Sequence, residues 1–182
     1  MHFQPTEIPD VILIKPQVFK DERGFFQETY QKSRFAEMGI TADFVQDNHS
    51  GSRKNILRGL HYQIQNTQGK LVRAIKGEIY DVAVDIRRSS PTFKQWVGVR
   101  LSAERHEQLW VPPGFAHGFL TLSDWVEIIY KTTDIYAPQH ERTLLWNDPA
   151  VGVIWPLSEG FAPEMSAKDM QGKLLSDLDL FD

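Results

Sequence analysis

The segment EIYDVAVDI, residues 78–86, alternates two sets of side chains along its length. The sets are Ile79, Asp81, Ala83 and Asp85, and Glu78, Tyr80, Val82, Val84 and Ile86. A period of two residues is that of a β-strand, in which successive side chains point to opposite faces. The segment therefore predicts a half-buried strand.

Similar runs rich in β-branched and aromatic residues precede and follow this segment, separated by turn signals. Among these signals are KDERG (20–24), DNHSGSRKN (47–55), NTQGK (66–70), VPPG (111–114), YAPQHE (136–141) and NDPAVG (147–152). We find no internal repeat and no Gly/Ser-rich linker, so residues 1–182 are expected to form one domain. Many short strands predict an all-β fold of antiparallel sheets, a sandwich or a barrel; their spacing alone does not identify a jelly roll.

Two short helices interrupt this β pattern. One is predicted at QKSRFAEMG, residues 31–39, where Phe35 and Met38 share a face and Gly39 ends the helix. A second, weaker helical stretch begins near SAKDMQGKLL, residues 166–175.

The composition excludes several classes of function. The formal net charge of −4 argues against a nucleic-acid partner, and no apolar run approaches membrane-spanning length. The first ten residues lack the layout of a signal peptide. Because the chain has no cysteine, disulfides, thiolate nucleophiles and cysteine zinc sites are excluded. We expect a soluble, cytoplasmic protein with no membrane partner.

Residues capable of chemistry lie inside the strand-like runs. Arg58 and His61 share one run, Lys70 opens the next, His117 follows VPPG, and Tyr130 lies in a later run. Strict alternation would place Arg58 and His61 on opposite faces of their strand. Gly59 lies between them and could carry a β-bulge that turns both into one pocket.

A metal site is one alternative for these histidines. The segment PPGFAH, residues 112–117, is similar to a turn of metal-binding cupin barrels that supplies one histidine ligand. Such barrels pair it with a His-x-His dyad, but the position two beyond His61 is Gln63. We therefore expect no metal. From the local sequence alone, His61 is better interpreted as a core histidine bonded to its neighbours. For His117, a functional role and a histidine bonded to backbone carbonyls near a turn are equally favoured.

The wider set of residues favours chemistry. Histidine, tyrosine, lysine and a carboxylate are the groups that proton abstraction next to a carbonyl requires.

Nine segments together resemble the dTDP-4-dehydrorhamnose 3,5-epimerase family, with the order and spacing of the family's motifs kept. They are ERGFFQETY, FVQDNHSGS, LRGLHYQ, KLVRAIKGEIYDVAVDIR, SPTFKQWVGVRLS, LWVPPGFAHGFLTLSD, YKTTDIYAPQHER, WNDPAVGVIWP and SAKD. The resemblance implies a cupin-type jelly-roll barrel without a metal or other cofactor, its C-terminal segment (about 160–182) packed over the barrel. It also implies a homodimer whose subunits exchange strands. The implied activity inverts C3 and C5 of dTDP-4-keto-6-deoxy-D-glucose in dTDP-L-rhamnose biosynthesis.

The resemblance also implies catalytic and binding roles. His61 matches the base, Asp169 the carboxylate that orients it, Lys70 the group facing the enolate oxygen, and Tyr130 the acid. The matched substrate-binding positions are Arg23, Glu28, Gln46, Asn48, Arg58, His117, Glu141 and Lys168. Phe25 and Phe26 are expected to stack on thymine or, at least as readily, to pack in the core.

The sequence departs from the family pattern at three places. Three other functions are also compatible with the residues described above. The departures are Lys54-Asn55, Lys94, and the missing proline after Asp169. The rivals are an epimerase that inverts only C3 or only C5, a sugar-nucleotide 3,4-ketoisomerase, and a nucleotide-sugar-binding barrel without activity. The order of the inversions and the end product stay open.

Overall fold

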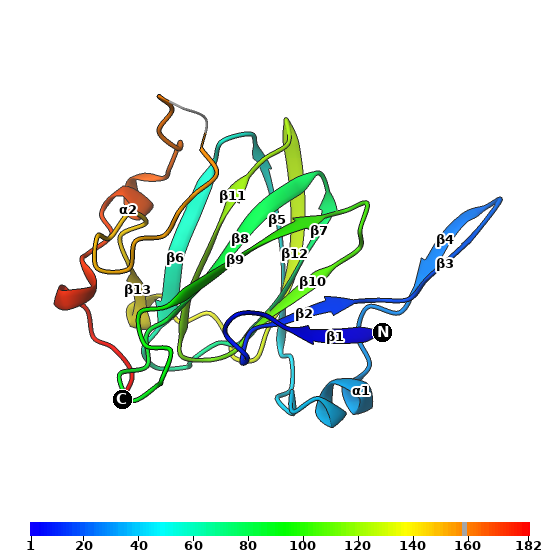
Figure 1. The fold of residues 1–182 in the computed structure, drawn as a ribbon, viewed down its shortest axis with the longest axis horizontal. Coiled ribbons are helices and arrows are strands. Elements are labelled where there is room, and N and C mark those ends of the chain that lie inside the picture. The colour runs from blue at the N-terminus through cyan, green and yellow to red at the C-terminus, as the bar shows by residue number, and fades with distance from the viewer. Residues whose placement is uncertain (158–159) are drawn as a thin grey trace.

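The computed structural model of the protein describes residues 1–157 and 160–182. Two antiparallel sheets face each other and form a barrel (Figure 1). One sheet contains, in order, β1 (His2–Pro5), β2 (Ile12–Lys15), β10 (Gln108–Val111), β7 (Lys70–Lys76), β12 (Trp125–Thr132) and β5 (Gln46–Arg53). The other contains β13 (Glu141–Thr143), β6 (Leu57–Gln63), β11 (Phe115–Thr121), β8 (Glu78–Asp85) and β9 (Trp96–Ser102). The predicted all-β class, a cupin-type jelly roll of antiparallel sheets, is confirmed.

Strand β8, which the alternating segment predicts, is buried on both faces. Ile79 and Ala83 belong to the core inside the barrel. Val82 and Val84 belong to a second core, where Leu175 and Leu178 of the C-terminal segment pack against the outer face of the sheet. The prediction of a half-buried strand was therefore wrong, because a distant segment covers the face that would otherwise meet water.

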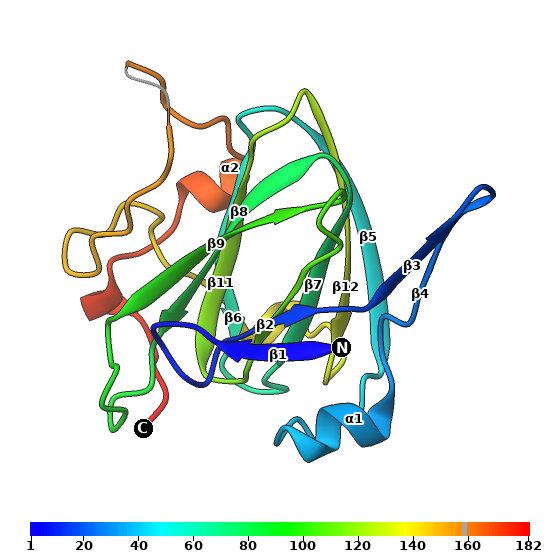
Figure 2. The same ribbon diagram turned by 45° about the vertical axis from the view of Figure 1, so that its right-hand side comes forward.

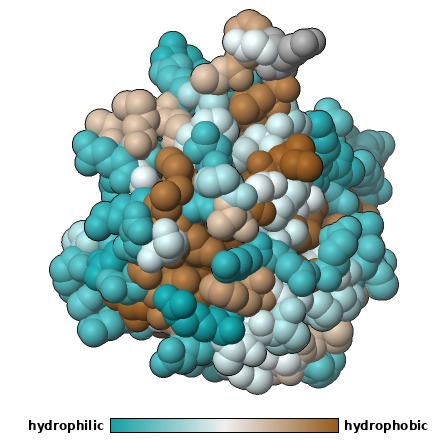
Figure 3. Space-filling view, turned by 60° about the vertical axis from the view of Figure 1, so that its left-hand side comes forward, coloured by the Kyte–Doolittle hydropathy of each residue, from teal (hydrophilic) through white to brown (hydrophobic). Residues whose placement is uncertain are grey.

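The chain after β13 wraps over this outer face. It contains α2 (Ala167–Met170) and a 3-10 turn, η2 (Leu175–Asp177), which agrees with the weak helical signal there. Its side toward solvent is partly apolar, as the brown areas among hydrophilic side chains indicate (Figure 3). Exposed apolar residues of this part of the chain are Ile154, Phe161, Met170 and Leu174.

The other predicted helix, α1 (Lys32–Glu37), is present but shorter than expected. Phe35 is fully buried, whereas Met38 is 45% exposed, so only Phe35 packs in the core. Met38 follows the last helical residue, and helical periodicity therefore does not direct its side chain inward. Gly39 adopts a positive φ of 83° at the predicted end of the helix.

One segment with turn-like composition is a strand, and another ends in the first residue of a strand. Residues 47–55 predict a turn, yet Gln46–Arg53 forms β5 and pairs along its whole length with β12. The last residue of the turn signal YAPQHE begins β13, which follows the 3-10 turn η1 (Pro138–His140). In β5, Asn48, Ser50 and Ser52 face inward, and the residues between them are exposed. Both faces are polar, because one lines a cavity and the other meets solvent.

Strands β3 (Val18–Asp21) and β4 (Gly24–Gln27) pair only with each other among the described strands and form a hairpin. The hairpin projects away from the barrel in both ribbon views (Figures 1 and 2). Phe19, Phe25 and Phe26 on it are 55%, 61% and 69% exposed. Of the two placements left open for Phe25 and Phe26, packing in the core was therefore wrong, and stacking on thymine stays a prediction.

No helix in residues 1–157 and 160–182 has both the length and the apolar character needed to cross a membrane.

Candidate active site

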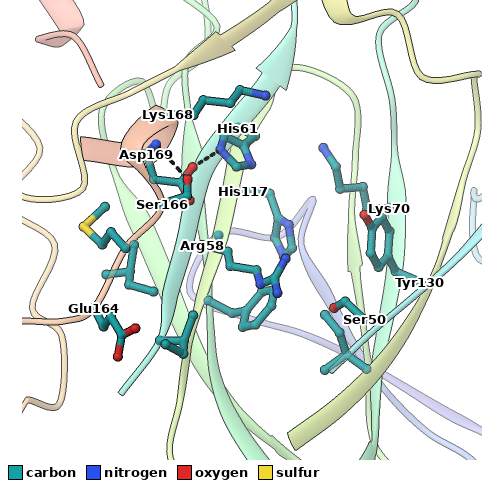
Figure 4. A pocket seen from close by; sticks show the side chains of 16 residues that line it. Ser50, Arg58, His61, Lys70, His117, Tyr130, Glu164, Ser166, Lys168 and Asp169 are labelled. Atoms are coloured by element: carbon teal, nitrogen blue, oxygen red, sulfur yellow. Dashed lines mark hydrogen bonds and ion pairs between the residues drawn. The ribbon is translucent and has the colours of Figure 1, made fainter. Parts of the chain in front are cut away.

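A β-bulge in β6 brings Arg58 and His61 to the same side of the sheet. His117 of β11 pairs with His61, and Phe119 pairs with Arg58, so two steps along β11 match three along β6. Gly59 makes this possible with a φ of +123°, in a position where a Cβ atom would lie 2.5 Å from Gly118 Cα. Arg58 and His61 both line one cavity (Figure 4). The bulge hypothesis is confirmed.

This cavity has a volume of about 510 Å³ and lies between the two sheets. The five-stranded sheet contributes Arg58, His61 and His117, and the six-stranded sheet contributes Ser50, Lys70 and Tyr130. Ser166, Lys168 and Asp169 reach it from the C-terminal segment. Figure 4 places His61 on one wall and Lys70 and Tyr130 on the opposite wall, with His117 between them.

His61 is bonded to a carboxylate that is 108 residues distant in sequence. Its Nε2 lies 2.5 Å from Asp169 Oδ1. The bonds from His61 and Ser166 outweigh burial and lower the pKa of Asp169, so the carboxylate is ionised and accepts. Nε2 therefore carries the hydrogen, and Nδ1 is left as the basic nitrogen of the neutral ring.

His117 is held in the same way by Asp81. Its Nε2 lies 2.8 Å from Asp81 Oδ1, and the two side chains are 8% and 0% exposed. Within the described part of the chain, Asp81 Oδ2 has no hydrogen-bond partner. His117 is thus a buried histidine bonded to a neighbouring side chain, an aspartate and not the backbone, and it also lines the cavity.

Lys70 and Tyr130 are ionisable groups on one wall of the cavity, and burial shifts the pKa of both. Burial lowers the pKa of Lys70 to about 8, although Glu141 and Asp81 oppose the shift. Burial raises the pKa of Tyr130, and the guanidinium of Arg58 partly offsets the effect. Tyr130 is consequently a neutral phenol that can donate a proton at neutral pH.

A second cavity of about 290 Å³ shares His61, Lys70 and Tyr130 with the first. Gln46, Asn48 and Glu141, predicted as binding residues, line it. Glu141 forms an ion pair with Lys168, a binding residue predicted from a different motif. The structure therefore brings ten of the twelve predicted site residues to two adjoining cavities.

Arg23 and Glu28 are the two exceptions. Arg23 is on the projecting hairpin and bonds Asp21 at 2.6 Å, and Glu28 follows the hairpin and bonds Arg34 at 3.0 Å. Neither lines the two cavities of its own chain, because the hairpin points away from the barrel.

Several residues of the site were not predicted. Tyr136 lines the second cavity, is 50% exposed, and donates to Glu141 Oε2 at 2.7 Å. Gln63 holds the Tyr136 loop by donating to Ile135 O and accepting from Ala137 N. Asp81 and Ser166 also escaped prediction, although all four lie inside recognised segments, because their roles depend on contacts with distant residues.

Among residues 1–157 and 160–182, no three His, Asp or Glu side chains are grouped so that they could hold a metal ion.

Comparisons with known proteins agree with this geometry. The family described as dTDP-4-dehydrorhamnose 3,5-epimerase matches residues 5–177. The chain is 59% identical over 175 residues to the dTDP-4-dehydrorhamnose 3,5-epimerase of Pseudomonas aeruginosa, covering 96% of both chains. It matches the dTDP-6-deoxy-D-glucose-3,5-epimerase of Legionella pneumophila, solved with dTDP-4-keto-L-rhamnose, with a TM-score of 0.94 and 51% identity, covering 98% of this chain and 94% of that one.

A more distant match has a different specificity. A 3'-monoepimerase from Streptomyces bikiniensis, solved with dTDP-quinovose, has a TM-score of 0.86 and 31% identity, covering 97% of this chain and 88% of that one. The jelly-roll barrel, the family match over nearly the whole chain and the identity of 59% lead to one conclusion: the chain belongs to the dTDP-4-dehydrorhamnose 3,5-epimerase family.

Proposed function

We propose that this protein inverts C3 and C5 of dTDP-4-keto-6-deoxy-D-glucose by proton transfer through an enolate, giving dTDP-4-keto-L-rhamnose. The observation that carries the proposal is the placement of His61 and Tyr130 on opposite walls of one cavity, with Lys70 beside Tyr130 (Figure 4). Inversion at a carbon requires a base and an acid on opposite faces of a planar intermediate.

The first step is removal of a proton. C3 and C5 both flank the C4 ketone, so either proton is acidified by that carbonyl. His61 Nδ1 accepts the proton, and the imidazolium that forms is stabilised by Asp169 at Nε2. The electron pair of the broken C–H bond moves onto the C4 oxygen, where the Lys70 ammonium stabilises the negative charge.

The second step returns a proton from the opposite face. Tyr130 donates its phenolic hydrogen to the carbon, and the C4 carbonyl re-forms. The step leaves a phenolate on Tyr130 and a proton on His61. Both groups must exchange with water before the second inversion, so solvent hydrogen enters the product.

The second cavity suits the nucleotide. Gln46 and Asn48 offer amide groups, and the exposed ring of Tyr136 offers a flat apolar face against which a base can stack. Arg58 is positioned by Ser52, to which its Nη2 donates at 3.0 Å. Its planar guanidinium is well suited to a pyrophosphate.

The function is tested by incubating enzyme and the 4-keto sugar in heavy water. We expect deuterium at C3 and C5. His61→Asn should abolish incorporation at both carbons without weakening dTDP binding, and Tyr130→Phe should lower net epimerisation more than exchange. Absence of exchange in the wild-type protein would leave a nucleotide-sugar-binding barrel.

The alternative is inversion of C3 alone, which the likeness to the S. bikiniensis 3'-monoepimerase favours. The higher identity to the P. aeruginosa enzyme favours the double inversion. Deuterium at one carbon only in the same experiment would identify a monoepimerase.

We also infer that the protein acts as a homodimer in which each hairpin, residues 18–27, reaches the site of the other subunit. Phe19 and Phe26 pair across the hairpin, Phe25 lies on its other face, and all three rings are exposed, which is unusual for so short a segment of a stable monomer. Arg23 extends from the tip with 86% of its side chain exposed. In this arrangement Arg23 and Glu28 bind substrate held by the partner subunit.

A further inference from the structure

The carboxylate of Asp169 is held by more than the histidine it orients. Oδ1 contacts His61 Nε2, and Oδ2 accepts a hydrogen bond of 2.8 Å from Ser166 Oγ. Asp169 is 4% exposed, so water contributes little to fixing its orientation.

Ser166 makes a second contact with the same residue. Its Oγ accepts from the backbone N–H of Asp169 at 3.1 Å, which makes it the N-cap of α2. One hydroxyl therefore holds both the backbone and the carboxylate of Asp169.

The helix itself cannot supply this rigidity. Helix α2 has four residues, about one turn, and a single turn is marginal without capping or tertiary contacts. Without the bond to Oδ2, the carboxylate could rotate about its Cβ–Cγ bond and lose the alignment of Oδ1 with Nε2.

We propose that Ser166 is a positioning residue, which fixes the carboxylate of Asp169 so that His61 presents Nδ1 to the substrate. This inference rests on the proposed epimerase function and deepens it. Ser166 takes no proton in the reaction. Its hydroxyl keeps Oδ1 in place while His61 cycles between imidazole and imidazolium.

Three substitutions of Ser166 distinguish its role in positioning Asp169 from its role as the N-cap of α2. Ser166→Ala removes the hydroxyl and the cap, Ser166→Gly removes the hydroxyl but keeps a better cap than alanine, and Ser166→Thr keeps both. Ser176→Ala is the matched control, since Ser176 lies in the same segment and bonds exposed Asp177.

We expect Ser166→Ala and Ser166→Gly to lower kcat to the same extent, by about tenfold, with KM unchanged. Deuterium incorporation at C3 and C5 should fall in parallel, because both depend on His61. Ser166→Thr should restore kcat, and Ser176→Ala should match the wild-type enzyme.

A spectroscopic measurement tests the geometry without reference to turnover. The hydrogen between His61 Nε2 and Asp169 should give a low-field proton NMR resonance, assigned by its loss in His61→Asn. It should persist in Ser166→Thr and in Ser176→Ala, and broaden or disappear in Ser166→Ala and Ser166→Gly.

Three outcomes would overturn the proposal. The resonance and kcat could be unchanged in Ser166→Ala, Ser166→Gly could retain much more activity than Ser166→Ala, or KM could rise with kcat unchanged. The second outcome would make Ser166 a helix cap alone, and the third would make it a substrate contact. Absence of exchange in the wild-type enzyme would instead remove the proposed function, and the NMR comparison would still decide whether Ser166 orients Asp169.

Discussion

At the residue scale, the chemistry of the site depends on which carboxylate faces which base or cation. Asp169 faces His61, Asp81 faces His117, and Glu141 faces Lys168. Each pair joins residues at least 27 positions apart. Local sequence therefore identifies the residue types but not the partners, and the pairing of His61 with Asp169 could be anticipated only through the family resemblance.

Lys70 leads to a prediction about pH at this scale. Its pKa is lowered to about 8, so the ammonium is present below this pH and is lost above it. If the cation stabilises the enolate oxygen, kcat/KM should fall as the pH rises through about 8. Lys70→Arg, which stays protonated, should shift this decline to higher pH.

Stability should change in the opposite direction. Between about pH 8 and 10.5, the unfolded chain binds a proton on Lys70 that the folded protein does not. The free energy of unfolding should therefore rise with pH in this window. Urea unfolding of the wild-type protein and of Lys70→Met checks the sign, since the variant should lack this rise. An equal rise in the variant would contradict the assignment.

At the element scale, the pocket depends on the register in which β6 pairs with β11. Strand β5 shows how composition misleads: a polar sequence with turn character forms a full strand because β12 supplies its hydrogen bonds. In strand β6, Gly59 indicates a possible bulge, and the register with β11 establishes it. In both cases the neighbouring strand decides the outcome.

Gly118 leads to a prediction at this scale. A Cβ atom there would lie 2.5 Å from Arg58 O and 3.0 Å from Gly59 Cα, so β6 and β11 would have to separate. Gly118→Ala should lower the free energy of unfolding by about 1–3 kcal/mol, as overpacking does. It should also lower kcat strongly, because Arg58 and His61 would both shift.

Gly152→Ala provides the matched control. Gly152 has a φ of +67°, but no atom lies within 4 Å of the position that a Cβ would occupy, so alanine there should cost stability through backbone strain and leave kcat intact. Urea unfolding and kcat measured on both variants separate the two effects. Wild-type kcat in Gly118→Ala would show that the close approach of the β6 and β11 backbones at Gly118 does not position the site.

At the scale of the whole molecule, the projecting hairpin is the feature that one chain leaves unexplained. Ten predicted site residues meet at adjoining cavities, whereas Arg23 and Glu28 lie on or next to the hairpin of β3 and β4, which projects away from the barrel (Figure 2). The proposed dimer accounts for both the exposed phenylalanines and the displaced binding residues with one contact.

Subunit mixing tests this arrangement. Arg23→Ala and His61→Asn homodimers should each have low activity. If Arg23 acts on the partner's site, a heterodimer contains one intact site, and an equal mixture refolded together should recover about a quarter of wild-type activity.

A mixture of Lys70→Met with His61→Asn is the control, because both residues line the cavity of their own chain. It should recover nothing. Failure of the Arg23→Ala mixture to exceed this control would mean that Arg23 does not act in trans, and sedimentation as a monomer would exclude the dimer itself.

The sequence by itself determined the all-β class, most turn positions and the residue types of the site, because these follow from local periodicity, backbone preferences and recognisable motifs. Only the tertiary structure decided that β8 is buried on both faces, that β5 is a strand, that the bulge unites Arg58 with His61, and that Ser166 holds Asp169. Each of these depends on which distant segment covers a face or donates a hydrogen bond, and the local sequence does not identify that segment.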